Sequence, residues 1–280
     1  MQNGLTEWAG LRLDRPRVMG ILNVTPDSFS DGGTHFSTHS AIAAGRRLLA
    51  QGADLLDIGG ESTRPGAAQI SPHEEAARII PVIEALAAEG AVISVDTRNA
   101  VTMAAGLDAG ARIINDISAL SHDPASLELM VERACPVVLM HMRGTPATMM
   151  HMTQYGDVVD DVVRDLCARR DTALKAGVRA ENICLDPGFG FAKQGAQNIA
   201  LLRALHHFTE IGAPLLVALS RKRFLGEISG EAEARQRDPE TLAASLYAMS
   251  LGAHILRVHD VGGTVRALRV WQTLTERQDG

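Results

Sequence analysis

Short apolar runs alternate with longer amphipathic stretches along this chain, and that alternation constrains the fold more than any other feature. Strands that are buried on both faces read as continuous apolar runs, and parallel strands need helical crossovers between them. The runs that predict strands are residues 18–22, 55–58, 91–95, 112–114, 137–140, 183–185, 215–219 and 255–258.

The intervening stretches have the spacing of amphipathic helices. The clearer ones are residues 40–51, 72–88, 97–109, 157–176, 239–251 and 262–277, and weaker patterns occur at 125–133 and 198–205. Several of these stretches are followed by a glycine before the next strand, which is a common way for a helix to end. These glycines are Gly52, Gly90, Gly110, Gly177, Gly212 and Gly252.

Eight strands alternating with eight helices over 280 residues are typical of a (β/α)8 barrel. Two stacked doubly wound domains are the competing architecture, but they need a linker, and the chain has no Pro-, Ser- or Gly-rich break. We therefore predict an α/β fold with a single TIM-barrel domain over residues 1–280. Residues 1–17 are expected to form a cap on the barrel floor.

Composition narrows the function classes. The net charge of −6 argues against broad nucleic-acid binding, which needs a basic face. No apolar run approaches the length of a membrane span, and the polar start MQNGLTEWAG has no signal-peptide core. The three cysteines show no CxxC spacing, so reduced, buried thiols in a cytoplasmic protein are expected.

In such a barrel the active site lies at the carboxyl ends of the strands. A polar residue at one strand end often marks only where the strand stops, since loops are polar. Here every predicted strand ends in a polar or ionisable group. The groups are Asn23, Asp57, Asp96, Asn115 with Asp116, His141, Asp186, Ser220 with Lys222, and Arg257 with His259.

Acids and cations are separated around this predicted mouth. A carboxylate can accept two parallel N–H groups from a guanidine-like edge, as it does from Arg, and the amide of Asn115 adds a donor and an acceptor. The cations Lys222, Arg257 and His259 follow the last two strands, where phosphate sites of this fold often lie, and Arg64 would join them. The mouth is predicted to bind a flat polar ring beside a multiply charged anion.

A long polar segment, NVTPDSFSDGG, follows the first strand. Segments of this length in compact domains are usually functional or disordered. We expect a mobile lid that Asn23 anchors at the strand end and that bends at Gly32 and Gly33.

Seven motifs then occur in order between Met19 and Val261: MGILNVTPDSFSDGG, GGESTRPGA, IINDISAL, LMHMRGTPATM, LDPGFGFAK, LSRKRFLG and RVHDV. Together they resemble the dihydropteroate synthases, the folate-pathway enzymes that sulfonamides inhibit. Two positions depart from the family pattern, Ala119 where a glycine is expected and Gln197 where histidine is frequent. Both flank the predicted mouth.

The resemblance implies a reaction in which 6-hydroxymethyl-7,8-dihydropterin diphosphate and 4-aminobenzoate give 7,8-dihydropteroate and diphosphate. It also implies site residues. The pterin would be held by Asp96, Asn115, Asp186 and Lys222, the diphosphate by Arg257 and His259, and Mg2+ by Asn23. A second loop would carry Thr63, Arg64 and Pro65, and the aminobenzoate would lie against Pro65 and Phe191, near Lys222 and the helix start after Ser220.

Catalytic roles would fall to Asp96, Arg64 and Lys222. The family usually forms dimers, sulfonamides would compete with aminobenzoate, and no nucleic acid or membrane is expected as a partner. We interpret His141 as a hydrogen-bonded core histidine, and of Phe189 and Phe191 only one needs to face a ligand.

Two alternatives remain open from the sequence. A pterin-dependent methyltransferase of the same barrel type would share the pterin-binding Asp and Asn. It would not need the segment TPDSFSDGG or the pair Arg257 and His259. A non-catalytic pterin-binding paralogue would have degraded loops, and both loops are intact in this sequence.

Overall fold

A computed structural model describes residues 6–25, 34–62 and 69–275. Within these ranges eight parallel strands form a nearly closed barrel in the order β8-β7-β6-β5-β4-β3-β10-β9, and a bridge between Leu185 and Leu215 joins its two edges. The strands are β3 Arg17–Asn23, β4 Leu55–Gly59, β5 Ile93–Asp96, β6 Ile113–Asp116, β7 Val137–Met140, β8 Ile183–Asp186, β9 Leu216–Val217 and β10 Ile255–Val258. The predicted barrel is confirmed.

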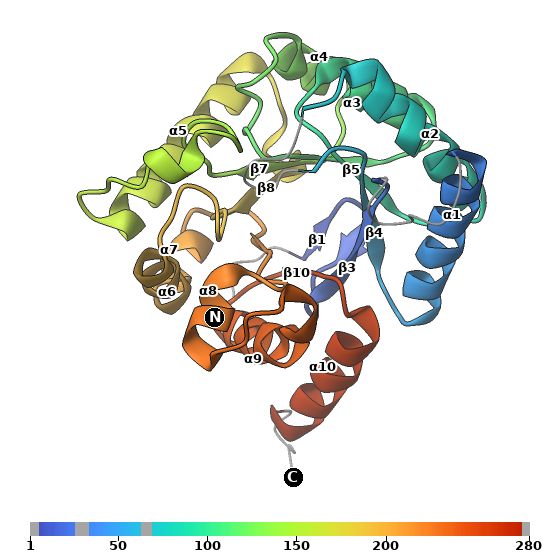
Figure 1. The fold of residues 1–280 in the computed structure, drawn as a ribbon. Coiled ribbons are helices and arrows are strands. Elements are labelled where there is room, and N and C mark those ends of the chain that lie inside the picture. The colour runs from blue at the N-terminus through green and yellow to red at the C-terminus, as the bar shows by residue number, and fades with distance from the viewer. Residues whose placement is uncertain (1–5, 26–33, 63–68, 276–280) are drawn as a thin grey trace.

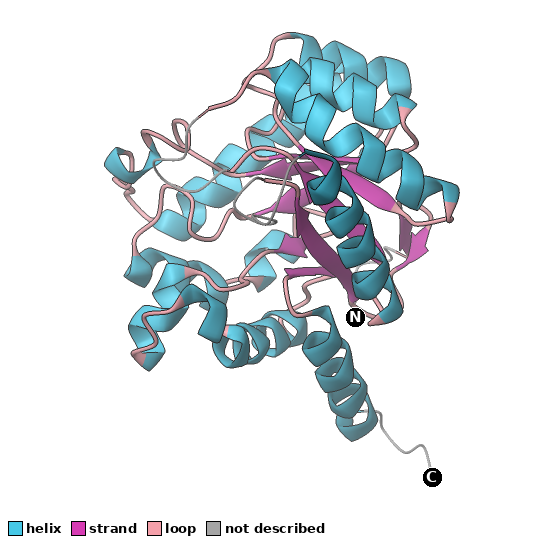
Figure 2. Cartoon of the chain, turned by 45° about the vertical axis from the view of Figure 1, so that its right-hand side comes forward, coloured by secondary structure: helices cyan, strands magenta, loops and turns pink. Residues whose placement is uncertain are grey.

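The helices surround this barrel as an outer ring (Figures 1 and 2). They are α1 Thr34–Ala50, α2 Pro72–Ala88, α3 Ala100–Asp108, α4 Ala125–Arg133, α5 Val158–Ala176, α6 Gly195–Arg203, α7 His206–Thr209, α8 Arg223–Ser229, α9 Asp238–Ser250 and α10 Val261–Thr275. Strand residues such as Ile58 and Val95 pack outward against buried helix residues such as Ile79 and Met103 in one large core cluster. None of the described helices is both long and apolar enough to cross a membrane.

Local chemistry fixes several helix ends. The Ser71 side chain accepts a hydrogen bond from the Glu74 N–H, and Pro72 occupies the first turn, so α2 begins there. The Asp157 side chain caps α5 in the same way, by accepting from the N–H groups of Val159 and Asp160. Gly177, with φ of 111°, ends that helix.

The N-terminal segment closes the barrel floor, as predicted. β1 (Glu7–Trp8) and β2 (Leu11–Arg12) form an antiparallel pair. Trp8 is 1% exposed and belongs to an inner cluster that includes Met19, Leu55 and Ile113 from the early parts of the strands. Its Nε1–H donates to the Asn182 carbonyl at 3.1 Å, so the floor is both packed and hydrogen-bonded.

Several elements differ from the sequence-based boundaries. α1 begins at Thr34, six residues earlier than predicted, and α6 begins at Gly195, three residues earlier. The seventh strand pairs with β10 only at Leu216 and Val217, because further along the His259 N–H donates to the Ser220 hydroxyl in place of a strand carbonyl. α3 begins at Ala100, three residues later than predicted. α7 and α8 were not predicted, since their four and seven residues are too few to show a helical period.

Candidate active site

The strand-end residues meet at the carboxyl-terminal face of the barrel. Asn23, Asp96 and Asp186 are the last residues of β3, β5 and β8, and Asn115 is one residue from the end of β6. Lys222 lies between β9 and α8, where it is the N-cap residue of that helix. The fold therefore gathers the predicted residues on one face, as parallel strands require.

Arg257 links the acids of two neighbouring strands, β4 and β5. Its Nε lies 2.5 Å from Asp57 Oδ2, and its Nη2 lies 2.6 Å from Asp96 Oδ2. The Asn115 side-chain N–H donates to the same Asp57 oxygen at 3.0 Å. Burial raises the pKa of Asp96, and the guanidinium of Arg257 opposes this rise. The cluster of two carboxylates and one guanidinium carries a net charge of −1 when both acids are ionised.

This cluster differs from the sequence-based picture in two ways. Arg257 had been grouped with the cations of the last two strands, whereas its side chain reaches the acids. Asp57, which is 0% exposed, was recognised as a strand-end acid but was not included in the site. The signal for it was present in the sequence, because Asp57 follows an apolar run in the same manner as Asp96 and Asp186.

Asp186 is a buried acid near Lys222. Its Oδ1 accepts from the Gly188 N–H at 2.7 Å, and burial raises its pKa to about 6 despite that bond and the nearby Lys222. Burial lowers the pKa of Lys222 to about 8 while Asp186 opposes the change. The Lys222 ammonium lies 4.4 Å from the centre of the Phe191 ring, within cation–π range.

Of the two phenylalanines in this turn, Phe189 is 1% exposed and packs in the core against Phe224. Phe191 is half-buried at the site. The expectation that only one of them faces a ligand fits this arrangement.

His259 is oriented by Ser220. The His259 backbone N–H donates to Ser220 Oγ at 3.0 Å, and the same oxygen lies 2.8 Å from His259 Nδ1. In the tautomer in which the Ser220 O–H donates to Nδ1, the ring proton is on Nε2. This tautomer provides an N–H donor suited to an anion.

Asn23 is half-buried at the end of β3, and its side-chain amide makes no hydrogen bond with any described residue. Within the described ranges no group of three or more His, Cys, Asp or Glu residues could hold a metal ion. An oxygen donor such as Asn23, shared with substrate phosphates and water, is nevertheless a usual environment for Mg2+.

Thr63, Arg64 and Pro65, and residues 26–33 of the first loop, lie outside the described residues. The base of the second loop shows a network that the sequence analysis missed. Glu75, 1% exposed, accepts hydrogen bonds from Thr97, Asn99 and Thr102 at 2.7–2.9 Å, and burial raises its pKa.

Two strand-end residues have structural roles. The buried Asp116 carboxylate accepts from the N–H groups of Ser118 and Leu120, so it stabilises the turn after β6. His141 is 5% exposed and bonds to Asp165 and Lys193, which agrees with the interpretation of a core histidine.

Comparison with known proteins assigns the family. The model of the family described as "Pterin binding enzyme" matches residues 19–259. A dihydropteroate synthase of Neisseria meningitidis serogroup B is 48% identical over 94% of each chain. One from Escherichia coli K12 is 46% identical over 96% of this chain and 95% of its own.

Solved structures of similar proteins give the same family assignment. A dihydropteroate synthase of Xanthomonas albilineans with 4-aminobenzoic acid has a TM-score of 0.91 and 50% identity, over 96% of this chain and 97% of its own. The same enzyme with 7,8-dihydropteroate has a TM-score of 0.87 and 47% identity, over 95% of this chain and 96% of its own. A Yersinia pestis dihydropteroate synthase in a sulfonamide complex has a TM-score of 0.89 and 44% identity, over 95% of this chain and 97% of its own. The chain therefore belongs to the dihydropteroate synthase family of pterin-binding enzymes.

Proposed function

We propose that this protein condenses 6-hydroxymethyl-7,8-dihydropterin diphosphate with 4-aminobenzoate, which gives 7,8-dihydropteroate and diphosphate. The observation that carries the proposal is the barrel mouth itself. It places the buried acid Asp186 near Lys222, and it places Asp57, Asp96 and Asn115 around Arg257. Relatives solved with 4-aminobenzoic acid and with 7,8-dihydropteroate support the choice of substrates.

The pterin would be bound through its donor edge. The Asp186 carboxylate suits the 2-amino and N3–H groups of the ring, which present two parallel donors as an arginine does. Asn115 would add an amide contact, and Lys222 would contact the same ring. Burial raises the pKa of Asp186 to about 6, so two ring donors would compensate a carboxylate that lacks full solvation in the free protein.

The diphosphate would be bound by Arg257 and His259. In the described part of the chain the Arg257 guanidinium makes two bonds, to Asp57 and Asp96, out of five N–H groups. Its three other N–H groups and His259 Nε2–H suit phosphate oxygens. Asn23 would hold Mg2+ together with the diphosphate, and the ion would supply positive charge to the leaving group.

In the proposed mechanism the bond between the pterin methylene and the diphosphate oxygen breaks before the new C–N bond forms. The electron-rich ring stabilises the resulting cation, and the cluster of Asp57, Asp96 and Arg257 favours it electrostatically when both acids are ionised. The aromatic amine is a weak nucleophile but needs little activation against a cation, so no dedicated base is assigned. Lys222 is the cation beside the pterin and the aromatic amine.

The aminobenzoate would lie beside Phe191 and Pro65, with its carboxylate near the start of α8. Thr63 and Arg64 would lie on the same loop and help to exclude water, because water would otherwise consume the pterin cation. Sulfonamides, which share the shape of aminobenzoate, would compete for this position, as the sulfonamide complex of the Yersinia pestis relative suggests.

We also infer a homodimer. Exposed apolar side chains occur on three successive helices, with Ile228 on α8, Tyr247 on α9, and Val270 and Leu274 on α10 at 60% and 79% exposure. A second copy of the chain would cover them, and sedimentation velocity tests this. The free, buried thiols of Cys135 and Cys184 support a reducing, cytoplasmic location.

The function is tested by diphosphate release from purified protein. Release should require both the pterin diphosphate and 4-aminobenzoate, and omission of either should abolish it. A methyltransferase or a non-catalytic binding protein would release no diphosphate under these conditions, and that result would refute the proposal.

A further inference from the structure

The turn between β8 and α6, residues 187–193, has an unusual backbone conformation at three positions. Gly188, Gly190 and Ala192 all have positive φ, and a Cβ at Gly188 would lie 2.0 Å from the His141 carbonyl oxygen. Ala192, with φ of 50°, adopts a conformation that residues other than glycine rarely take. Such a backbone persists only where its surroundings hold it.

Lys193 provides much of that support. The residue is 2% exposed, and its Nζ lies 2.9 Å from the carbonyl oxygens of Gly188 and Phe191 and 2.9 Å from His141 Nδ1. These three acceptors match the three N–H groups of an ammonium. Two backbone carbonyls of the 187–193 turn are thus bound to one side chain that the turn itself carries.

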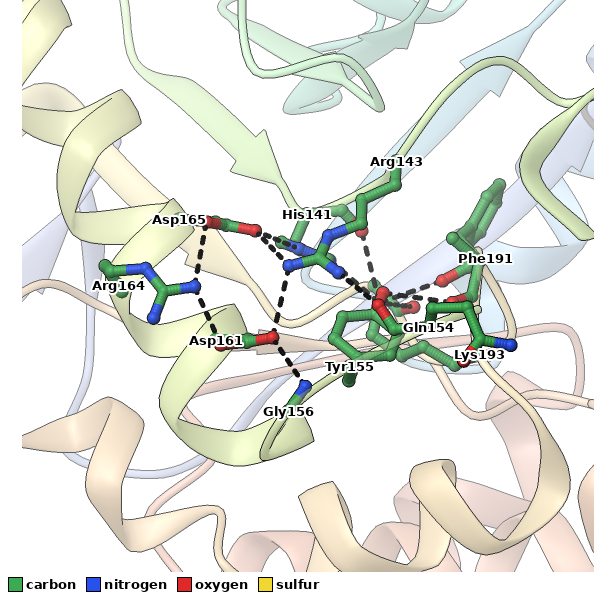
Figure 3. Close-up of polar contacts among 12 residues, drawn as sticks. His141, Arg143, Gln154, Tyr155, Gly156, Asp161, Arg164, Asp165, Phe191 and Lys193 are labelled. Atoms are coloured by element: carbon green, nitrogen blue, oxygen red, sulfur yellow. Dashed lines mark hydrogen bonds and ion pairs between the residues drawn. The ribbon is translucent and has the colours of Figure 1, made fainter. Parts of the chain in front are cut away.

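His141 anchors this ammonium to the rest of the barrel (Figure 3). Its Nε2 lies 3.2 Å from Asp165 Oδ2 on α5, and burial together with Lys193 lowers its pKa to about 3. The ring is therefore neutral, with Nε2–H donating to Asp165 and Nδ1 accepting from Lys193. This tautomer connects α5 to the turn through one continuous chain of hydrogen bonds.

Tyr155 holds a third carbonyl. Its O–H donates to the Ala192 carbonyl at 3.0 Å, and its ring lies against the guanidinium of Arg143, 4.0 Å from the ring centre. Arg143 in turn donates to Asp165 at 3.1 Å, and Figure 3 shows these groups in one connected cluster. The carbonyls of Gly188, Phe191 and Ala192 are therefore each bound by Lys193 or Tyr155. These two side chains are connected to Asp165 on α5 through His141 and Arg143.

The turn reaches the proposed substrate site at several points. The Gly188 N–H donates to Asp186, a Cβ at Gly190 would lie 3.0 Å from Lys222 Cδ, and the Phe191 ring lies 4.4 Å from Lys222 Nζ. A shift of the turn would therefore move the Phe191 ring away from Lys222, whereas Asn115 and Asp96 stand on separate strands.

We propose that Lys193 is a positioning residue. Its hydrogen bonds to the Gly188 and Phe191 carbonyls and to His141 hold the Phe191 ring against Lys222, and this contact shapes the aminobenzoate side of the site. This role rests on the proposed function. Lys193 touches no substrate and acts through Phe191.

The test is Lys193→Met, which keeps the length of the side chain and removes its three donors. The matched control is Lys175→Met, at an exposed position on α5. We expect the KM for aminobenzoate to rise about tenfold or more in Lys193→Met, and the KM for pterin diphosphate to rise by a clearly smaller factor, because the Gly188 N–H of the same turn also donates to Asp186. Lys175→Met should leave both constants unchanged.

Hydrogen exchange of peptides covering residues 187–193 tests the contacts of Lys193 without an activity assay. The amides of Gly188, Gly190 and Phe191 are all hydrogen-bonded, so they should exchange about tenfold faster or more in Lys193→Met. If the unmodified protein releases no diphosphate, the proposed function fails. The exchange measurement still decides whether the hydrogen bonds of Lys193 hold the turn.

Tyr155→Phe covers the case in which Lys193→Met does not fold, because it removes one hydroxyl and keeps the ring under Arg143. It should speed amide exchange in residues 187–193 and raise the aminobenzoate KM, both by a smaller factor than Lys193→Met does. The positioning role is refuted if folded variants keep the normal aminobenzoate KM. It is equally refuted if both KM values rise by the same factor, because that result would mean a purely structural role.

Discussion

At the scale of single residues, Asp57 is the acid on which the mouth depends most. Its Oδ2 accepts from both Arg257 and Asn115, while its buried Oδ1 has no hydrogen-bond partner among the described residues. A buried, unpartnered carboxylate oxygen is costly, and such costs concentrate where function requires them. Asp57 therefore fixes the position of two proposed substrate-binding side chains.

The sequence could place these acids at strand ends but could not pair them. Asp57 and Arg257 are 200 residues apart, and which acid an arginine reaches depends on side-chain conformation within the barrel. Lys193 shows the same limit. In the sequence it is one cation in the motif LDPGFGFAK, and only the backbone of the 187–193 turn shows that its ammonium faces inward to two carbonyls.

Asp186→Asn should weaken pterin binding by about 30-fold or more. The amide would place an N–H group against the donor edge of the ring, and the loss of a charged, buried pair costs about 2–5 kcal/mol. Calorimetric titration with the pterin diphosphate measures this. Unchanged affinity would remove Asp186 from the site.

The same variant should gain stability at neutral pH. The pKa of Asp186 is raised from 3.8 to about 6 by burial, so the folded state favours the protonated acid. The stabilising effect of that proton is fully present below pH 3.8 and is lost as the pH rises through about 6. The unfolding free energy of Asp186→Asn relative to the unmodified protein should therefore increase over this window, by up to about 3 kcal/mol. A difference that stays constant from pH 3.5 to pH 7, chosen to span that window, would contradict the assignment.

At the scale of elements, two helices have the boundaries that the sequence pattern predicted. α2 covers residues 72–88 because capping at Ser71 and a regular apolar face define it, and α4 covers residues 125–133 although its pattern is weaker. Other boundaries differ from the predicted ones where a side chain takes a hydrogen bond that the regular backbone would otherwise make. Thr97 and Asn99 bond to Glu75, which delays α3, and Ser220 replaces a strand partner after β9.

The end of α4 predicts a stabilising substitution. Ala134 follows the helix with φ of 47°, in the left-handed region that favours glycine, and it is exposed. Ala134→Gly should raise the unfolding free energy by about 0.5–1 kcal/mol. Ala168→Gly, inside α5 and also exposed, is the matched control and should lower it by about 1 kcal/mol. Thermal unfolding of both variants measures the sign, and a loss of stability at position 134 would contradict the argument.

The second loop predicts a kinetic effect. Arg64→Ala should reduce turnover far more than stability, because a cation on a closing loop acts on the occupied complex. Diphosphate release and melting temperature would be measured together, with the exposed Arg169→Ala on α5 as control. A large loss of stability with normal turnover per folded molecule would instead make Arg64 structural.

At the scale of the whole molecule, the proposed site is assembled from most of the barrel, so its ligands should bind in a defined order. Aminobenzoate has one carboxylate and one ring, too little to order two loops against their conformational entropy. Pterin with diphosphate and Mg2+ supplies the charge around which Asn23, Arg257 and His259 would gather.

Aminobenzoate should therefore bind weakly to the free protein and far more tightly once pterin, diphosphate and Mg2+ are present. By reciprocity, aminobenzoate should strengthen diphosphate binding by the same factor. Calorimetry in both directions measures this coupling. Equal aminobenzoate affinity in the two states would show that the pocket is preformed and would refute the closing-loop account.

The central claim is that the carboxyl-terminal mouth of this barrel joins a pterin to an aromatic amine. Its most direct test is the formation of 7,8-dihydropteroate by the purified protein from pterin diphosphate and 4-aminobenzoate, with Asp186→Asn measured alongside. The unmodified protein should form product and diphosphate in equal amounts, and the variant should lose activity by about 30-fold or more, as the loss of at least about 2 kcal/mol of binding requires. No product from the unmodified protein, or equal rates from both proteins, would contradict the claim.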